Sequence, residues 1–317
     1  MDRIALTKIG DIPRPDGGWS LAASAPAYDG SLLFLFVEDS GKDAIGETYQ
    51  SGMGTFPRPR MPEAKRFKFI RQSGQELHTH ELPELDTTFP MIDVFPDGKI
   101  LIVGPRCAWR AEGDYDLNGI VFDPSSGRCQ RILLGDGIEN VFVDDRGRIW
   151  VSYFDEGIFG NFGWGHPGPA PIGSAGVVCF ARNGRKIWEL SEADAGSMAD
   201  CYAMNVSGAS AAIYFYTDFP LCKISADFEL AFWKTELRGC HTFAISERSV
   251  LFSAQYDDRP DTVYFSTLGE GRLNEPVQLT LTLPGGAALP QGKLIGRGRR
   301  MYFFDAAGAY CIDLLGM

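Results

Sequence analysis

A short pattern recurs about six times along this 317-residue sequence and restricts the possible fold more than any other feature. In each copy, a turn or a polar residue precedes a strongly apolar run of the length of a β-strand. The copies are "DGSLLFLFV", "DGKILIVG", "RGRIWVSYF", "GASAAIYFYT", "ERSVLFSAQ" and "GRRMYFFD". A shorter strand-like run precedes each copy, and another follows after a loop of variable length. Repetition at this spacing predicts a series of equivalent structural units.

A fourth strand-like run completes most of the units, each after a turn that contains Gly, Asn or Asp. Four antiparallel strands within roughly 40 to 65 residues are typical of one blade of a β-propeller. We therefore expect an all-β, six-bladed β-propeller that forms a single domain over residues 1–317. The second strand is apolar throughout because the neighbouring blades cover both of its faces. Helix is expected only in "SEADAGSMAD" and at the start of "EAKRF".

The sixth unit has no fourth strand of its own, since the sequence ends at "YCIDLLGM". The run from Arg3 to Ile9 alternates in the required way, and we expect it to complete the last blade and close the array. The alternative is a seventh blade between Asp39 and Ala64. That segment shows no strand pattern and is better interpreted as an insertion.

Composition excludes some partners and locations. The 30 basic and 41 acidic residues give a formal charge of -11, which argues against a nucleic acid as partner. No apolar run reaches the length of roughly 18 residues that a spanning helix needs, and the N-terminal segment has no apolar signal region. We expect a cytoplasmic protein without a membrane partner. Most of the seven cysteines fall inside apolar runs, which predicts buried thiols rather than disulfides.

The run "ENVFVDDRGRIWVSYFDEGIFGN" resembles the repeats of propellers of the two-component-regulator type. Its features are an apolar strand, a D-x-x-G turn and an Ile-Trp-Val strand, although Ser152 and Tyr153 replace the usual Gly-Thr. More loosely, the whole chain is similar to the six-bladed propellers of the gluconolactonase and senescence-marker class. This second resemblance implies a divalent cation such as Ca²⁺, held by carboxylate and Asn oxygens at the mouth of a central channel.

The longest loops occur in the first three units, and loops of this kind share one face of a propeller. They comprise Asp39 to Ala64, "PRCAWRAEGDYDLN" and "FDEGIFGNFGWGHPGPAPIGS". Long loops of this kind are usually functional, and their aromatic side chains suit a binding site. We expect a small molecule or a protein to bind there, with Trp109, Asp155, Trp164 and His166 among the contacts. The alternative is that these aromatic residues only pack the loops together.

A second candidate site follows from the register of the repeats. The residues that lead into the first strand of each blade should lie at the channel mouth, and they include Glu139, Asn140, Asp200 and His241. Glu139, Asn140 and Asp200 are candidate metal ligands, and Glu139, Asp200 and His241 are candidate catalytic residues. The alternative is an ordinary polar channel.

Three functions remain open at this point. The first is binding of a ligand or partner on the long-loop face without catalysis. The second is a metal-dependent hydrolase or lactonase that acts at the channel mouth. The third is a sensor module separated from its signalling partner. The sequence does not decide whether the protein is an enzyme.

Overall fold

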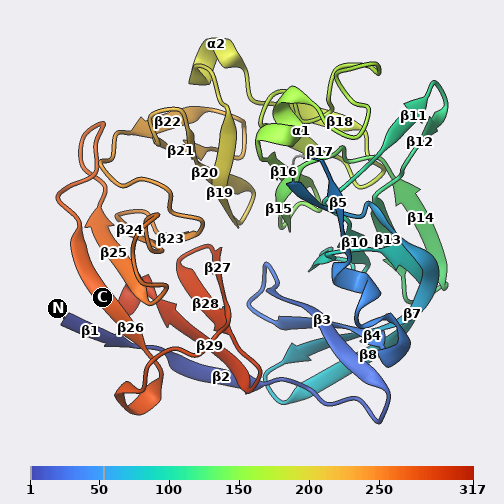
Figure 1. The fold of residues 1–317 in the computed structure, drawn as a ribbon. Helices are drawn as coiled ribbons and strands as arrows, with labels where there is room; N and C mark the ends of the chain where they lie inside the picture. The colour runs from blue at the N-terminus through green and yellow to red at the C-terminus, as the bar shows by residue number, and fades with distance from the viewer. Residues whose placement is uncertain (1, 53) are drawn as a thin grey trace. The chain divides into compact units, whose positions relative to one another are not determined.

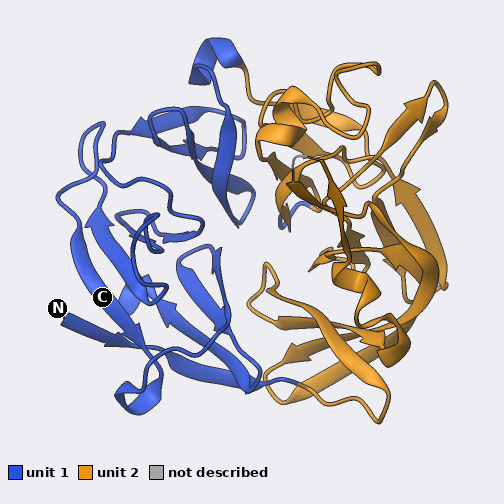
Figure 2. Cartoon of the chain, in the orientation of Figure 1, with its two compact units in different colours: residues 1–12, 144–146, 192–317 blue, residues 13–143, 147–191 orange. Residues whose placement is uncertain are grey.

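The computed structural model describes residues 2–52 and 54–317. The chain divides into two compact units (Figure 2), of which unit 1 contains residues 1–12, 144–146 and 192–317 and unit 2 contains residues 13–143 and 147–191. Among the described residues, each unit carries three of the six blade sheets, and unit 2 also carries two two-stranded sheets. The fold is that of an all-β, six-bladed propeller, as the sequence predicts. A single domain over residues 1–317 stays a prediction.

Unit 2 contains the first three blades, labelled in Figure 1. Blade 1 consists of β3 (Trp19–Pro26), β4 (Leu32–Glu38), β7 (Arg60–Ser73) and β8 (Glu76–Thr87). Blade 2 consists of β9 (Met91–Val94), β10 (Ile100–Val103), β13 (Gly119–Asp123) and β14 (Arg128–Ile132). Blade 3 consists of β15 (Ile138–Val143), β16 (Ile149–Tyr153), β17 (Val177–Phe180) and β18 (Lys186–Glu189).

Unit 1 contains the other three blades. Blade 4 consists of β19 (Asp200–Ser207), β20 (Ser210–Tyr216), β21 (Leu221–Ile224) and β22 (Leu230–Trp233). Blade 5 consists of β23 (Phe243–Ile245), β24 (Ser249–Phe252), β25 (Thr262–Thr267) and β26 (Val277–Thr282). Blade 6 consists of β27 (Lys293–Arg297), β28 (Arg300–Phe304) and β29 (Gly308–Asp313).

The N-terminal segment completes the last blade, but it also does more than predicted. Strand β2 (Thr7–Asp11) pairs antiparallel with β29, and the separate strand β1 (Asp2–Ala5) pairs parallel with β26 of blade 5. Between them Leu6 is 2% exposed and packs against residues of blades 5 and 6. The predicted single strand from Arg3 to Ile9 is therefore divided at a buried residue. Met1 lies outside the described residues.

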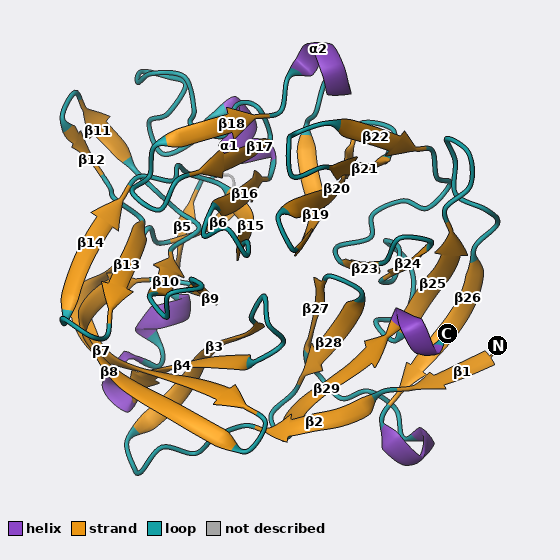
Figure 3. Ribbon diagram, turned by 180° about the vertical axis from the view of Figure 1, so that it is seen from behind, coloured by secondary structure: helices purple, strands orange, loops and turns teal. Residues whose placement is uncertain are grey.

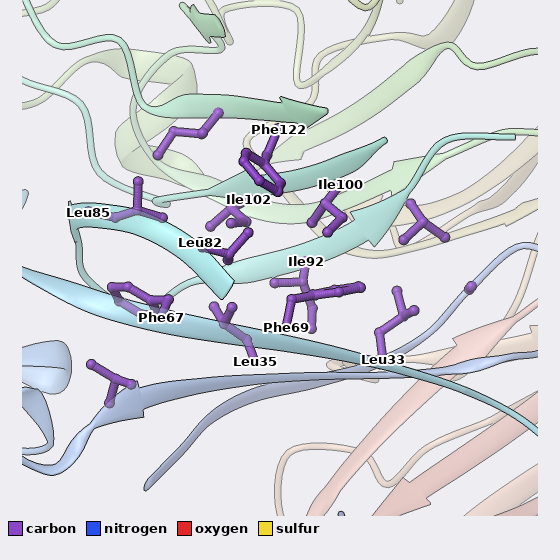
Figure 4. Packing of buried hydrophobic residues seen from close by; sticks show 14 of the residues in the cluster. Leu33, Leu35, Phe67, Phe69, Leu82, Leu85, Ile92, Ile100, Ile102 and Phe122 are labelled. Carbon is purple, nitrogen blue, oxygen red and sulfur yellow. The ribbon is translucent and has the colours of Figure 1, made fainter. Parts of the chain in front are cut away.

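The second strands of the middle blades, β10 and β24, are entirely buried because side chains of the neighbouring blades of the same unit cover both of their faces. Figure 4 shows this packing between blades 1 and 2, where Leu33 and Phe69 meet Ile92 and Ile102. Buried polar groups also join blades. The Asp93 carboxylate accepts from the Val143 amide at 2.7 Å in unit 2, and Asn205 in unit 1 bonds the Phe243 carbonyl at 2.7 Å.

The helices and 3-10 turns lie in the connections between the strands (Figure 3). Residues 39–59, most of the insertion predicted from Asp39 to Ala64, contain the 3-10 turns η1 (Asp39–Gly41) and η2 (Ala44–Gly46) and a hairpin of β5 (Thr48–Ser51) and β6 (Gly54–Pro57). The hairpin was not predicted, and residues 60–64 belong to β7. A second hairpin joins β11 (Trp109–Ala111) and β12 (Asp114–Tyr115).

Helix α2 (Glu192–Ala195) lies in the segment where helix was predicted. The helix predicted at the start of "EAKRF" is wrong, because β7 pairs along that segment with β8. Helix α1 (Asp155–Phe159) was not predicted. Two further 3-10 turns, η3 (Pro284–Gly286) and η4 (Leu314–Gly316), lie near the end of the chain. In the part of the chain that the structure describes, no helix is long and apolar enough to span a membrane.

Candidate functional site in the long loops of unit 2

The three long loops predicted to share a face contact one another in unit 2. The Arg60 guanidinium of the first loop donates to the Asp116 carboxylate of the second, and the Trp109 amide of the second donates to the Phe162 carbonyl of the third at 2.9 Å. Glycine makes the second contact possible, since a Cβ on Gly163 would lie 2.1 Å from the Trp109 carbonyl oxygen. The loops therefore form one packed surface layer.

A buried arginine lies at the centre of this layer. The Arg106 side chain is 3% exposed, and its guanidinium pairs with the Asp136 carboxylate at 3.0 Å and the Glu156 carboxylate at 2.5 Å. The rings of Phe154 and Phe162 lie 5.4 Å and 4.5 Å from the guanidinium. One arginine thus joins the loop after β10, the loop before β15 and helix α1.

Burial is the largest influence on the pKa values of Asp136 and Cys107 in this cluster. It raises the pKa of Asp136 to about 7, against the opposing effects of Arg106 and of the amide of Cys107, which donates to Asp136 Oδ1 at 2.7 Å. The nearby Glu156 carboxylate raises the pKa of Asp136 further. Burial also raises the pKa of the Cys107 thiol. A buried ion cluster of this kind fixes loop geometry, and removing one member leaves a buried charge without its partner.

A hollow opens beside this cluster, and we call it the arginine pocket. It has a volume of 360 Å³ and is lined by Tyr49, Arg58, Pro59, Arg60, Ala108, Arg110 and Asp116. Asp116 is 2% exposed, and it accepts from Ala108 N and Arg110 Nη1, both at 2.9 Å, and from Arg60. The side chains of Arg58, Arg60 and Arg110 remain 44%, 43% and 46% exposed. Three guanidinium groups therefore face one hollow.

The residues predicted to bind a ligand lie in this layer, in different environments. Trp164 is buried, and its indole donates to the Cys107 carbonyl at 2.8 Å. Trp109 is half-buried against Gly163 and Gly168. Asp155 begins helix α1 and is exposed, as is His166. The two tryptophans hold the loops together, and ligand contacts by any of the four stay a prediction.

The residues predicted to form the channel-mouth site fall in both units. Glu139 and Asn140 belong to β15 of unit 2, where Asn140 Nδ2 donates to Ser152 Oγ at 3.2 Å. Asp200 begins β19 of unit 1, and His241 stacks on Tyr202 at 5.3 Å. Burial lowers the pKa of His241. Their convergence, the bound cation and the hydrolase hypothesis stay predictions.

Among residues 2–52 and 54–317, no group of three or more His, Cys, Asp or Glu side chains is arranged to hold a metal ion. Sequence reasoning missed the arginine pocket. The signal was present, because "FPRPR" belongs to one of the densest basic patches of this acidic chain. The sequence does not show that Arg110, about fifty residues further on, faces the same hollow.

Comparison with known protein families gives one match. The sequence profile of the YxzG family matches residues 174–312, which is less than half of the chain. No curated protein matches the chain.

Three solved structures are similar to the chain, each at low identity. One is a catalytically inactive virginiamycin B lyase from Staphylococcus aureus with quinupristin, with 9% identity, 96% of this chain and 98% of that chain covered, and a TM-score of 0.45. A second is YCF48 bound to D1 peptide, with 9% identity, 95% and 98% coverage and a TM-score of 0.46. The third is the extracellular domain of a B. thetaiotaomicron protein described as a hybrid two-component system, with 8% identity and a TM-score of 0.45. This chain covers 39% of the third protein and is itself covered to 96%.

Proposed function

We propose that this protein is a binding protein and that the arginine pocket of unit 2 receives the carboxylate groups of an acidic peptide segment. The observation that carries the proposal is the gathering of Arg58, Arg60 and Arg110 around one surface hollow of 360 Å³. Guanidinium groups match carboxylates with paired hydrogen bonds, which makes arginine the usual residue for recognising them.

The present partners of two of these arginines can be exchanged at little cost. Arg58 pairs with Glu47 at 3.0 Å and Arg110 with Asp114 at 2.8 Å, and these carboxylates are 36% and 60% exposed. Arg110 keeps a second partner, the buried Asp116, at 2.9 Å. Exposed ion pairs of this kind contribute about 0 to 1 kcal/mol. A ligand carboxylate can therefore replace either partner without a large loss of stability.

The third arginine and the layer beneath it supply rigidity. Arg60 pairs with the buried Asp116, and Asp116 is held in turn by the Ala108 amide. The Arg106 cluster lies under the same loop. A preformed pocket loses less conformational entropy on binding than flexible surface arginines would lose.

The overall charge of -11 does not oppose this binding at short range. At an ionic strength of 0.1 M, charges more than about 10 Å apart are largely screened. The local guanidinium groups then determine the potential that a carboxylate meets in the pocket. We expect the affinity for acidic peptides to fall as salt concentration rises.

Fluorescence anisotropy with a labelled Glu-Gly decapeptide tests the proposal. We expect saturable binding that weakens at least tenfold in the double variant Arg58→Ala/Arg110→Ala. The matched control is Arg128→Ala/Arg185→Ala, which changes the net charge equally at exposed positions of the same unit. Equal weakening in both variants would show that the arginine pocket is not the site. Binding of free glutamate as tight as that of the peptide would assign the pocket to a small carboxylate instead.

A further inference from the structure

A second and larger hollow lies within unit 1, and we call it the blade-4 groove. Its volume is 1210 Å³, and its walls come from blade 4, blade 5 and the C-terminal turn η4. It shares no residue with the arginine pocket. Volumes of this order accommodate small organic ligands.

The strand register explains why blade 4 leaves this space. Across its sheet, Ala212 of β20 pairs with Lys223, and Lys223 pairs with Ala231. In blade 5, Ile245 pairs with Val250 as Val206 pairs with Ala211 in blade 4, so the equivalent row is Leu251, Phe265 and Val277. Blade 4 therefore has two alanines and a lysine where blade 5 has three large apolar residues.

Lys223 gives the groove a positive charge at a half-buried position. Its ammonium group donates to the Ser246 carbonyl at 2.9 Å and lies 5.5 Å from the Trp233 ring. An ammonium has three N–H donors, and this bond uses one of them. Burial lowers the pKa of Lys223, while the nearby Glu247 carboxylate acts in the opposite direction. A ligand anion would supply the solvation that the protein withholds.

Apolar side chains border the same hollow. Phe265 forms part of its wall, and Leu315 and Met317 of the C-terminal turn are 73% and 38% exposed beside it. Exposed apolar groups next to a concave surface commonly mark a binding site. Arg248, Arg299, Glu229 and Glu247 also line the groove, which thus combines charged groups of both signs with an apolar wall.

We propose that the blade-4 groove binds a small amphipathic carboxylate, whose carboxylate contacts Lys223 and whose hydrocarbon chain lies along Ala231 and Ile245. The two alanines provide the room for the chain. The ammonium provides a hydrogen bond and a charge of opposite sign. This inference is independent of the arginine pocket and of its proposed peptide ligand.

Isothermal titration calorimetry with sodium decanoate below its micellar concentration tests the inference on the full chain. We expect saturable binding with one site, at least tenfold weaker for acetate, because acetate has no chain to bury. Lys223→Met should weaken decanoate binding at least tenfold, whereas Lys223→Arg should retain most of it. Lys234→Met is the matched control, since it removes an exposed lysine at the end of the same blade and outside the groove.

A second variant tests the space rather than the charge. Ala231→Leu adds a side chain at an exposed position of the groove, so it should fold normally and still prevent decanoate from entering. Thermal melts of each variant establish that the fold is intact. Absence of saturable decanoate binding to the wild type would overturn the inference, as would decanoate binding unchanged in both Lys223→Met and Ala231→Leu.

Discussion

The buried carboxyl of Asp136 should make the stability of this protein depend on pH in a specific direction. Its pKa is raised from an ordinary value of 3.8 to about 7 by burial. Between these two pH values the folded state binds a proton that the unfolded chain has released. The free energy of unfolding therefore falls as pH rises. The stabilisation is fully present below pH 3.8 and is lost by about pH 7.

The size of the effect follows from the difference between the two pKa values. Each pKa unit corresponds to 1.36 kcal/mol, so the difference between 3.8 and about 7 corresponds to at most about 4 kcal/mol. Asp136→Asn is neutral at every pH, and Arg106 keeps its second partner, Glu156, in the variant. We expect the wild type to lose up to about 4 kcal/mol relative to Asp136→Asn between pH 4 and pH 7.5.

Urea unfolding followed by far-UV circular dichroism at intervals of half a pH unit measures this difference. Asp194→Asn serves as a control, since it removes an exposed carboxylate in helix α2, far from the Arg106 cluster in sequence. Parallel stability curves for the wild type and Asp136→Asn would refute the reasoning. So would a difference of the opposite sign, because it would mean that Arg106 outweighs burial and holds the carboxyl ionised.

Two further predictions concern packing in unit 1. Leu6→Ala should lower the free energy of unfolding by about 2–5 kcal/mol because Leu6 is 2% exposed between blades 5 and 6. Ile9→Ala, at a side chain that is 37% exposed, should lower it less. Urea unfolding compares the two variants, and equal losses would show that Leu6 does not anchor the N-terminal segment. Gly296→Ala should lower the free energy of unfolding by about 3 kcal/mol or more, because the new Cβ would lie 1.8 Å from the Phe243 carbonyl oxygen. Gly316→Ala is the control, since its Cβ would meet no atom within 4 Å. A thermal melt of Gly296→Ala that matches the wild type would contradict this close approach.

The repeat pattern predicted most of the fold because each blade has a recognisable local sequence pattern. Each second strand must be apolar on both faces, and this requirement is visible as a continuous run such as "ILIV" or "IWVSY". No local sequence pattern marks the division of the N-terminal segment at Leu6. Residues on either side of Leu6 have similar strand character, and only their partners in β26 and β29 distinguish them.

The candidate sites were harder to predict because their residues are distant in the sequence and meet only in the folded chain. Asp116 looks like an ordinary loop carboxylate in the sequence, yet it is buried and bound by two arginines that precede it, Arg60 by 56 positions and Arg110 by six. The lysine of the blade-4 groove is equally difficult to recognise, because "LCKI" has the pattern of a third strand with one polar residue. Its meaning depends on the alanines that pair with it from β20 and β22.

The pairing of the N-terminal segment also determines when the protein can finish folding during synthesis. Thr7 pairs with Cys311, so β2 gains its partner only when nearly the whole chain has left the ribosome. At translation rates of 5–20 residues per second, roughly 300 residues take on the order of 15–60 s to make. Throughout that time the backbone donors and acceptors of β2 lack the strand partner that they have in the finished fold.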